Sequence, residues 1–328
     1  MLSLSTSSLL FKRRLARWTA ALAATVAFAC GAAFVSAPAC AASAVPGATV
    51  APAAAAPAAT PDAATSIASF PTTATGLVKM PDGRMLTPEF ARIAARGELV
   101  VAVLGVDQPP FFQEVNGKLT GIDIDIAKEL AAKLGVKVRF NRDARSFDGV
   151  VTLLANGGAD LAISKLSRTL SRAEVVSFSA PYIRLHRALL LNRVKFAELA
   201  HGRPAPDVVR NYDGTIGVVL NSSYASYVVS NFPHAKVVSF PSWDALLKGL
   251  SAGEVTAAYR DEFEVKHVLK VDPTASLRLR VITLEDLDDT ISIGVNVCAP
   301  ALLAYVNQFL AERTGKIDVM TLLQASND

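Results

Sequence analysis

A regular alternation of apolar, strand-like runs with amphipathic helical runs constrains the fold of this chain more than any other feature. From residue 98 the order is ELVVAVLGV, GIDIDIAKELAAKLG, VKVRF, FDGVVTLLANGG and ADLAIS. In the second run Ile122, Ile126 and Leu130 recur every four residues, which predicts a helix that Gly135 ends. Strands that alternate with helices in this way predict an α/β fold.

The same alternation starts again after residue 214. TIGVVL, AKVVSF and VTAAYR are typical of strands, and they alternate with the helical runs SSYASYVVSNF, SWDALLKGLSAG and DEFEVKHVLK. A strand, TISIGVNV, and a helix, ALLAYVNQFLAERTG, follow. Two successive α/β units predict two similar lobes, and a chain of 328 residues is long enough for two domains.

The first 77 residues have a different composition. FKRRLARW precedes the apolar run TAALAATVAFACGAAFVSA, and the small residues of ACAASA follow. This order predicts a signal peptide over residues 1–44, cleaved after Ala41 or Ala44, and therefore a periplasmic protein; an uncleaved membrane anchor is the alternative. Residues 45–77 are rich in alanine, proline and threonine, which predicts a disordered linker.

The excess of positive charge belongs to the predicted signal peptide. The chain has 33 Lys and Arg against 29 Asp and Glu, and residues 1–44 contain four basic and no acidic residues, so 29 of each remain. A neutral mature protein gives no indication of a nucleic-acid partner. The four histidines show no metal-ligand spacing, and no common nucleotide-binding or catalytic motif occurs. We therefore expect no metal, no cofactor and no catalytic residues.

A polar loop directly follows the apolar run ADLAIS. It reads SKLSRTLSR, from Ser164 to Arg172. Because ligands of open α/β sheets lie at the carboxyl ends of strands, we expect this loop to contact a ligand. The planar guanidinium of Arg172 offers two parallel donors, which suits a carboxylate.

Five motifs resemble, in order and spacing, those of the bacterial extracellular solute-binding proteins of family 3, the amino-acid receptors of ABC importers. They are Pro109-Pro110-Phe111, Gly121 to Ala127, Gly157 to Asp160, Ser167 to Arg172, and Phe178 to Tyr182. The resemblance implies a two-lobed periplasmic-binding-protein fold of type II, in which each lobe is a mainly parallel sheet flanked by helices and two crossover strands join the lobes. Lobe 1 is then expected over residues 78–190 and 291–328, and lobe 2 over residues 191–290.

The resemblance also implies which residues bind the ligand between the lobes. Arg172 would hold the α-carboxylate, Asp261 would pair with the ammonium, and Phe147 would pack on the ligand side chain. Asp261 could equally cap the following helix, and Phe147 could equally belong to the core. Further matching positions, expected to hydrogen-bond the ligand, are Ser164, Ser167, Asn221, Ser222 and Ser223.

Several residues depart from the pattern of the family: Lys165, Arg260, Thr256 in place of a usual acid, and Cys298-Ala299-Pro300 in place of a short charged turn. Lys165 stands where a small residue is usual, and it should either point into solvent or pair with an acidic group of the ligand. Arg260 stands beside Asp261 and could neutralise it. Arg168, in the same loop as Arg172, is expected in solvent.

The function that the resemblance implies is that of an exported, monomeric receptor, which delivers an amino acid or a close analogue to an ABC permease in the inner membrane. Two alternatives stay open. One is an enzyme on the same fold that resembles cyclohexadienyl dehydratase, in which Glu262 or Glu264 protonates a leaving hydroxyl. The other is a sensory partner that presents its ligand to a membrane receptor.

Overall fold

The computed structural model describes residues 67–313 and 317–326. The predicted signal peptide and most of the predicted linker lie outside these residues. Within the last part of that linker, Ile67–Ser69 form a 3-10 helix, and Ile67 and Phe70 pack against Val78 and Met80. Regular structure therefore begins before Val78, where the sequence had placed the start of the folded part.

Eight strands form one continuous sheet in the order β10-β9-β11-β8-β12-β7-β3-β6. Their bounds are β3 Glu98–Ala102, β6 Lys137–Asn141, β7 Leu161–Ala162, β8 Val176–Asn192, β9 Thr215–Val219, β10 Lys236–Phe240, β11 Ala257–Asp261 and β12 Leu279–Asn296. Two hairpins complete the strands: β1 Val78–Lys79 with β2 Met85–Leu86, and β4 Gln113–Val115 with β5 Lys118–Thr120.

The strands on each flank of the sheet are parallel, and they are antiparallel only next to its two long central strands. β10 and β11 pair parallel with β9, and β6 and β7 pair parallel with β3. β8 pairs antiparallel with β11 and β12, and β12 pairs antiparallel with β7. This arrangement confirms the expected α/β architecture with mainly parallel lobes.

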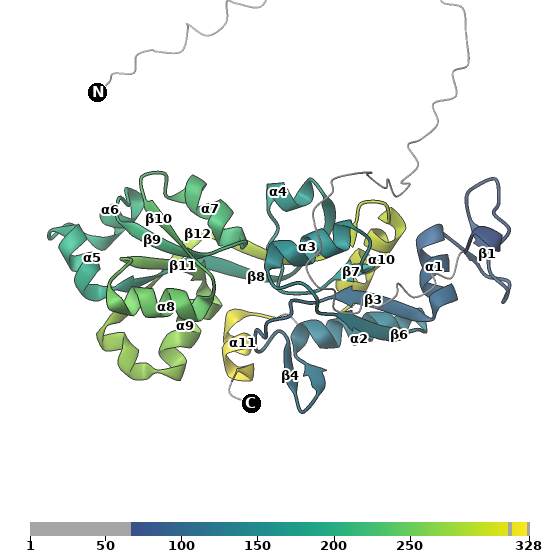
Figure 1. Cartoon of the computed structure of the whole chain (residues 1–328), viewed down its shortest axis with the longest axis horizontal. Helices are drawn as coiled ribbons and strands as arrows, with labels where there is room; N and C mark the ends of the chain where they lie inside the picture. Colours follow the sequence, from purple (N-terminus) through teal and green to yellow (C-terminus); the bar gives the residue numbers. More distant parts are fainter. Residues whose placement is uncertain (1–66, 314–316, 327–328) are drawn as a thin grey trace, which may run out of the picture. The chain divides into compact units, whose positions relative to one another are not determined.

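The two long strands β8 and β12 pass from one group of elements to the other (Figure 1). The sequence indicated only the ends of both, RALLLNR and TISIGVNV, although β8 starts at Val176 and β12 at Leu279. Their pairing shifts register between Leu284 and Asp288, where β12 holds extra residues. These strands are the two crossover strands that the family resemblance implied.

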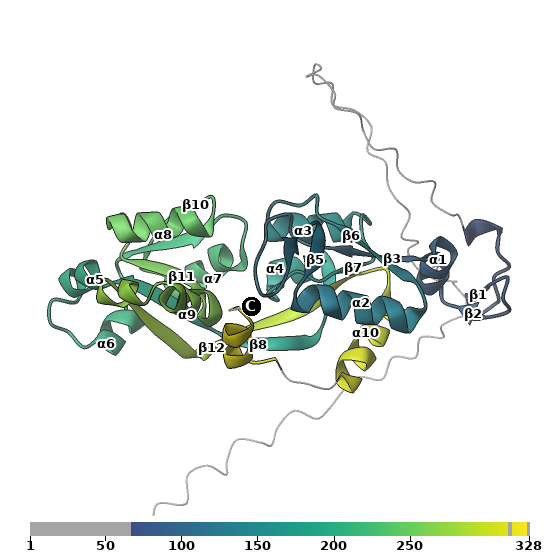
Figure 2. The same ribbon diagram turned by 90° about the horizontal axis from the view of Figure 1, so that it is seen from below.

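The helices cover the faces of the sheet on both flanks (Figure 2). α2 begins directly after Gly121 and ends at Gly135, whose φ of 69° lies in the left-handed region that favours glycine. Ser242 caps α8 as expected, because its side chain accepts a hydrogen bond from the Ala245 N–H. The helices are α1 Pro88–Arg96, α2 Ile122–Leu134, α3 Phe147–Ala155, α4 Leu170–Ala173, α5 Arg193–Ala200, α6 Ala205–Arg210, α7 Ser223–Asn231, α8 Trp243–Ala252, α9 Glu262–Val271, α10 Pro300–Glu312 and α11 Val319–Ala325, with a 3-10 turn at Pro273–Leu277.

Separate hydrophobic cores lie on the two flanks of the sheet. One core is formed by residues between Ile93 and Leu185 and between Ile291 and Leu322, together with Phe263. Two smaller cores, one on each face of the other flank, are formed by residues between Ala188 and Leu284. Lobe 1 denotes the elements around the first core, and lobe 2 denotes the elements around the two smaller cores. The residue bounds of the lobes that were drawn from the sequence stay a prediction.

Within the described residues, no helix has the length and apolarity to cross a bilayer.

Candidate functional site

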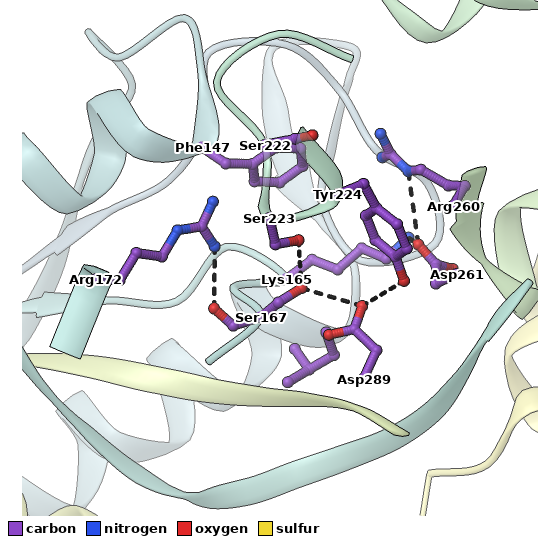
Figure 3. Close-up of a pocket in the computed structure, with 11 residues that line it drawn as sticks. Phe147, Lys165, Ser167, Arg172, Ser222, Ser223, Tyr224, Arg260, Asp261 and Asp289 are labelled. Carbon is purple, nitrogen blue, oxygen red and sulfur yellow. Dashed lines mark hydrogen bonds and ion pairs between the residues drawn. The ribbon is translucent and has the colours of Figure 1, made fainter. Parts of the chain in front are cut away.

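A small cavity lies where the loop after β7, the start of α7 and the strands β11 and β12 meet (Figure 3). The free space in it is about 10 Å³, enough for about one water molecule. Residues of both lobes contribute to its wall. They are Phe147, Lys165, Ser167, Arg172, Ser222, Ser223, Tyr224, Arg260, Asp261, Asp289 and Ile291.

Arg172 enters the cavity from α4, a single helical turn whose N-cap is Thr169. The side chain is buried. Its Nε and Nη2 donate to Asp148 Oδ1 at 2.9 and 2.7 Å, and its Nη1 donates to the Ser167 carbonyl at 3.0 Å. These bonds use three of the five guanidinium N–H groups, so one N–H on each terminal nitrogen is left. Arg172 is therefore held in place by the protein and keeps two donors for an anion.

The start of α7 brings the side chains of Ser222, Ser223 and Tyr224 to the cavity from lobe 2. The Ser222 hydroxyl turns back and donates to the Val219 carbonyl at 2.6 Å. The Ser223 hydroxyl donates to Ser167 Oγ at 3.0 Å, across the two lobes. The first N–H groups of a helix have no partner within it, so this end of α7 adds backbone donors to the wall that Arg172 occupies.

Lys165 is buried instead of solvated, so the alternative that placed it in solvent is wrong. Its φ of 47° lies in the left-handed region, which fits the small residue that is usual there. Its Nζ lies 2.6 Å from Glu264 Oε1 and 3.1 Å from Asp261 Oδ2, and it also faces the rings of Phe111 and Phe263. The carboxylates that Lys165 meets belong to the protein itself.

Arg260 adds a second cation to this cluster. Its Nε lies 3.6 Å from Asp261 Oδ2, its Nη2 lies 3.8 Å from Glu264 Oε1, and the same Nη2 donates to Gln108 in lobe 1. Burial disfavours the charged form of Glu264, but the charges of Lys165 and Arg260 outweigh this and hold the pKa of Glu264 below its usual value. Two cations and two carboxylates thus balance one another, and we call Lys165, Arg260, Asp261 and Glu264 the charge cluster.

The second role considered for Asp261, that of a helix cap, is present in the structure. Asp261 is the N-cap of α9, and its Oδ1 accepts a hydrogen bond from the Glu264 N–H at 3.1 Å. Its other oxygen, Oδ2, faces Lys165. Both oxygens therefore already have partners within the chain.

Asp289 is the other carboxylate of the wall, and the sequence analysis did not single it out. It is 1% exposed, and its Oδ2 accepts hydrogen bonds from the Tyr224 hydroxyl at 2.7 Å and from the Ser167 hydroxyl at 3.1 Å. Oδ1 is buried and has no hydrogen-bond partner among the described residues. Burial, and then the charge of Asp261, raises the pKa of Asp289.

Seven of the nine residues predicted to bind the ligand line the cavity, and two do not. Ser164 is buried outside it, where its hydroxyl accepts a hydrogen bond from the Leu104 N–H at 2.9 Å. Asn221 is exposed, and its carbonyl accepts from the Asp148 N–H. Arg168 is exposed as expected. Asp289 could not be distinguished from its neighbours in EDLDD by sequence, because the strand that buries it was recognised only from residue 290.

Asp123, another buried carboxylate, supports the polar loop from behind. It lies in the first turn of α2 and is fully buried. Its Oδ2 accepts from the Lys165 N–H at 2.6 Å, and its Oδ1 accepts from the Tyr182 hydroxyl at 2.8 Å. Burial raises the pKa of Asp123 to about 7, although these two hydrogen bonds act in the opposite direction.

The two glutamates considered as the proton donor of a dehydratase are engaged elsewhere. Glu264 is ionised in the charge cluster and has no proton to give. Glu262 accepts hydrogen bonds from the His186 N–H at 2.9 Å and from Lys266 Nζ at 2.6 Å, and it does not line the cavity. Neither side chain is arranged as a general acid.

Residues 99–320 match the model of the bacterial extracellular solute-binding proteins, family 3. The chain belongs to this family. The resemblance inferred from the five motifs is thereby confirmed. One relative of this family 3 protein is the ABC transporter arginine-binding protein 1 of Escherichia coli (strain K12), which is 26% identical over 231 residues, or 69% of this chain and 89% of that protein.

Solved structures give the same result for this family 3 protein. The amino acid ABC transporter substrate-binding protein AbpA from Streptococcus pneumoniae, bound to L-arginine, is 27% identical with a TM-score of 0.58, over 72% of this chain and 98% of that one. The ancestral amino acid-binding protein AncCDT-1, described as a precursor of cyclohexadienyl dehydratase, is 26% identical with a TM-score of 0.56, over 68% and 92% of the two chains. These two solved relatives and the arginine-binding protein are binding proteins, not enzymes.

Proposed function

We propose that this protein is an exported receptor that binds a small amino-acid-like ligand between its two lobes and delivers it to an ABC permease. The observation that carries the proposal is Arg172, a buried arginine in the wall of an interlobe cavity with two N–H groups left for an anion. A carboxylate there would meet the remaining guanidinium donors and the N-terminus of α7.

The proposed receptor binds by closure of its lobes. Lobe 1 and lobe 2 contact one another through neutral hydrogen bonds such as Ser223 to Ser167, and such bonds can separate and re-form. A ligand held between the lobes is removed from water on all sides, which strengthens its contacts with charged groups. The AbpA structure with L-arginine and the arginine-binding relative support an amino acid or an analogue as the ligand.

An importer as the partner follows from the relatives, two of which are named as components of amino acid or arginine ABC transporters. Export follows from the predicted signal peptide. We propose a binding protein and no enzymatic activity, because both candidate general acids, Glu262 and Glu264, are held by cations.

Thermal unfolding of residues 67–328 with each of the twenty common L-amino acids tests the proposal. A ligand that binds only the folded state raises the free energy of unfolding by about 2.7 kcal/mol when its concentration is a hundred times its Kd. The unfolding temperature rises accordingly. We expect at least one amino acid to do so. If none of them raises the unfolding temperature at millimolar concentration, the proposed function is wrong.

A further inference from the structure

The charge cluster leaves no place for a ligand cation at Asp261. Asp261 Oδ2 has Lys165 Nζ at 3.1 Å and Arg260 Nε at 3.6 Å, and its Oδ1 caps α9. A ligand ammonium would have to displace a cation that is covalently part of the wall. Displacement would bring Lys165 or Arg260 into contact with the incoming cation, at a cost that the new ion pair would not offset.

Asp289 differs because no cation of the described residues pairs with it. Among the described residues it makes no ion pair, and its Oδ1 accepts no hydrogen bond. Arg187 is the cation whose charge reaches it, but that guanidinium is stacked on Tyr227 at 3.6 Å and donates to Asn231. A buried carboxylate without a cation is unfavourable, so this position favours a ligand that brings one.

Asp289 and Arg172 line the same cavity. Both contact the same residue: Arg172 Nη1 donates to the Ser167 carbonyl at 3.0 Å, and the Ser167 hydroxyl donates to Asp289 Oδ2 at 3.1 Å (Figure 3). An anion-binding group and a carboxylate without a cation thus contact one residue of the wall from two sides. An α-amino acid carries its carboxylate and its ammonium on a single carbon, which suits two such groups in one cavity.

We infer that Asp289 receives the ammonium of the ligand whose carboxylate binds Arg172, while Lys165 occupies Asp261. This inference rests on the proposed function and specifies the ligand as an α-amino acid bound in an orientation set by β12. The raised pKa of Asp289 agrees with it, because burial and the nearby Asp261 both oppose a negative charge there. A bound ammonium would favour the charged form of Asp289 and so lower its pKa.

Calorimetric titration of three variants tests the inference, with the L-amino acid that gives the largest rise in unfolding temperature as the probe. Loss of one partner of a buried, hydrogen-bonded charge pair weakens binding by roughly 30-fold or more, so we expect this for Asp289→Asn. Asp261→Asn should change the Kd by less than about fivefold, because Lys165 and Arg260 keep Glu264 as a partner. Asp288→Asn is the matched control on the same strand; its side chain is 57% exposed, and its affinity should equal that of wild type.

Carboxyl-carbon NMR on the wild-type protein gives a second measurement that needs no variant to fold. The charged and titratable groups around Asp289 are Asp261 on β11, Arg187 on β8 and Tyr224 on α7. Binding of the probe should lower the pKa of Asp289.

The outcomes separate this inference from the proposed function. If Asp261→Asn loses the affinity while Asp289→Asn retains it, or if binding leaves the pKa of Asp289 unchanged, the ammonium does not lie at Asp289 and the inference is wrong, while the receptor function stands. If wild type binds none of the amino acids, both are wrong. Loss of affinity in Asp289→Asn, with a lowered pKa of Asp289 on binding, supports both.

Discussion

Asp261 and Asp289 are two carboxylates of one cavity wall that differ in how their charge is compensated. Both are almost fully buried, at 2% and 1% exposure; Asp261 is the last residue of β11, and Asp289 lies in the middle of β12. Asp261 has two cations of the same chain beside it, whereas Asp289 has two hydroxyl donors, and its Oδ1 accepts no hydrogen bond among the described residues. The comparison teaches that residue type and burial do not distinguish these two carboxylates; the presence or absence of a cation of the protein beside each one does.

Asp123 shows a third way to accommodate a buried carboxyl group. Its two hydrogen bonds come from an amide and a hydroxyl, and its pKa of about 7 means that the proton is retained into the neutral range. A cation, a proton and an incoming ligand are thus the three partners proposed for three buried aspartates. Each assignment predicts a different response to substitution.

The largest effect is expected from removing the cation of the charge cluster. Lys165→Met leaves Asp261 and Glu264 with Arg260 alone, and breaking a buried pair costs about 3–5 kcal/mol of unfolding free energy. Urea unfolding measures the loss. Lys128→Met is the control, because the pair of Lys128 with Asp125 is exposed and should contribute less than about 1 kcal/mol. Equal losses in the two variants would show that Lys165 does not compensate the cluster.

The stability of the protein should depend on pH through Asp123. The folded state binds this proton more tightly than the unfolded state does, because the pKa is about 7 in the fold against an ordinary value of 3.8. The resulting stabilisation is complete below pH 3.8 and is lost as the pH rises through 7, a change of about 4 kcal/mol. Asp123→Asn keeps the shape and removes this contribution.

Urea unfolding at several pH values between 4 and 8 compares wild type with that variant. Relative to Asp123→Asn, wild type should lose stability steadily across this range. Asp125→Asn, an exposed position on the same helix, should follow the wild-type curve. Parallel curves for wild type and Asp123→Asn would mean that Asp123 is already ionised in the fold.

Arg172→Lys should weaken ligand binding by roughly 30-fold or more while the fold survives. The charge is kept, but the paired N–H groups are lost, and such a loss at a desolvated pair costs on the order of 2–5 kcal/mol. Arg168→Lys, on the same loop and exposed, should change binding by less than about 1 kcal/mol. Calorimetric titration measures the affinity of both variants for the ligand. If Arg172→Lys binds as tightly as wild type, the ligand carboxylate binds elsewhere.

The smallest effect on binding is expected at Ser164. Ser164→Ala leaves the buried Leu104 N–H without an acceptor, so the free energy of unfolding should fall by about 1–2 kcal/mol. The Kd for the amino acid should stay within about twofold of wild type, because the hydroxyl faces the sheet and not the cavity. A tenfold loss of affinity with unchanged stability would reverse this assignment.

Most of the fold could be predicted from the sequence because periodicity and helix-end signals are local. The runs around Ile122 and Ser242 became helices with the expected glycine end or serine cap. The long strands β8 and β12 were recognised only at their ends, since PYIRLHR and RVITLEDLDD mix polar and apolar residues without strict alternation. Their length is fixed by pairing with each other over a long antiparallel ladder.

The site could be predicted only in part, because its partners come from distant segments. The sequence indicated Arg172 and Ser167 through the loop that holds them, and both line the cavity. It could not show that Lys165 would reach across to Glu264, which is 99 residues away in the chain. Asp289 was missed for the same reason, since only the meeting of β12 with α7 distinguishes it from Asp288.

The volume of the cavity also determines the order of events when a ligand arrives. A space of about 10 Å³ admits a water molecule but no amino acid, so a ligand cannot enter the proposed site while the lobes are this close. Encounter then has to wait for the lobes to part, and the observed rate of association in a stopped-flow experiment should level off at the rate of opening as ligand concentration rises. At high ligand concentration, the protein and not diffusion would set the pace of capture.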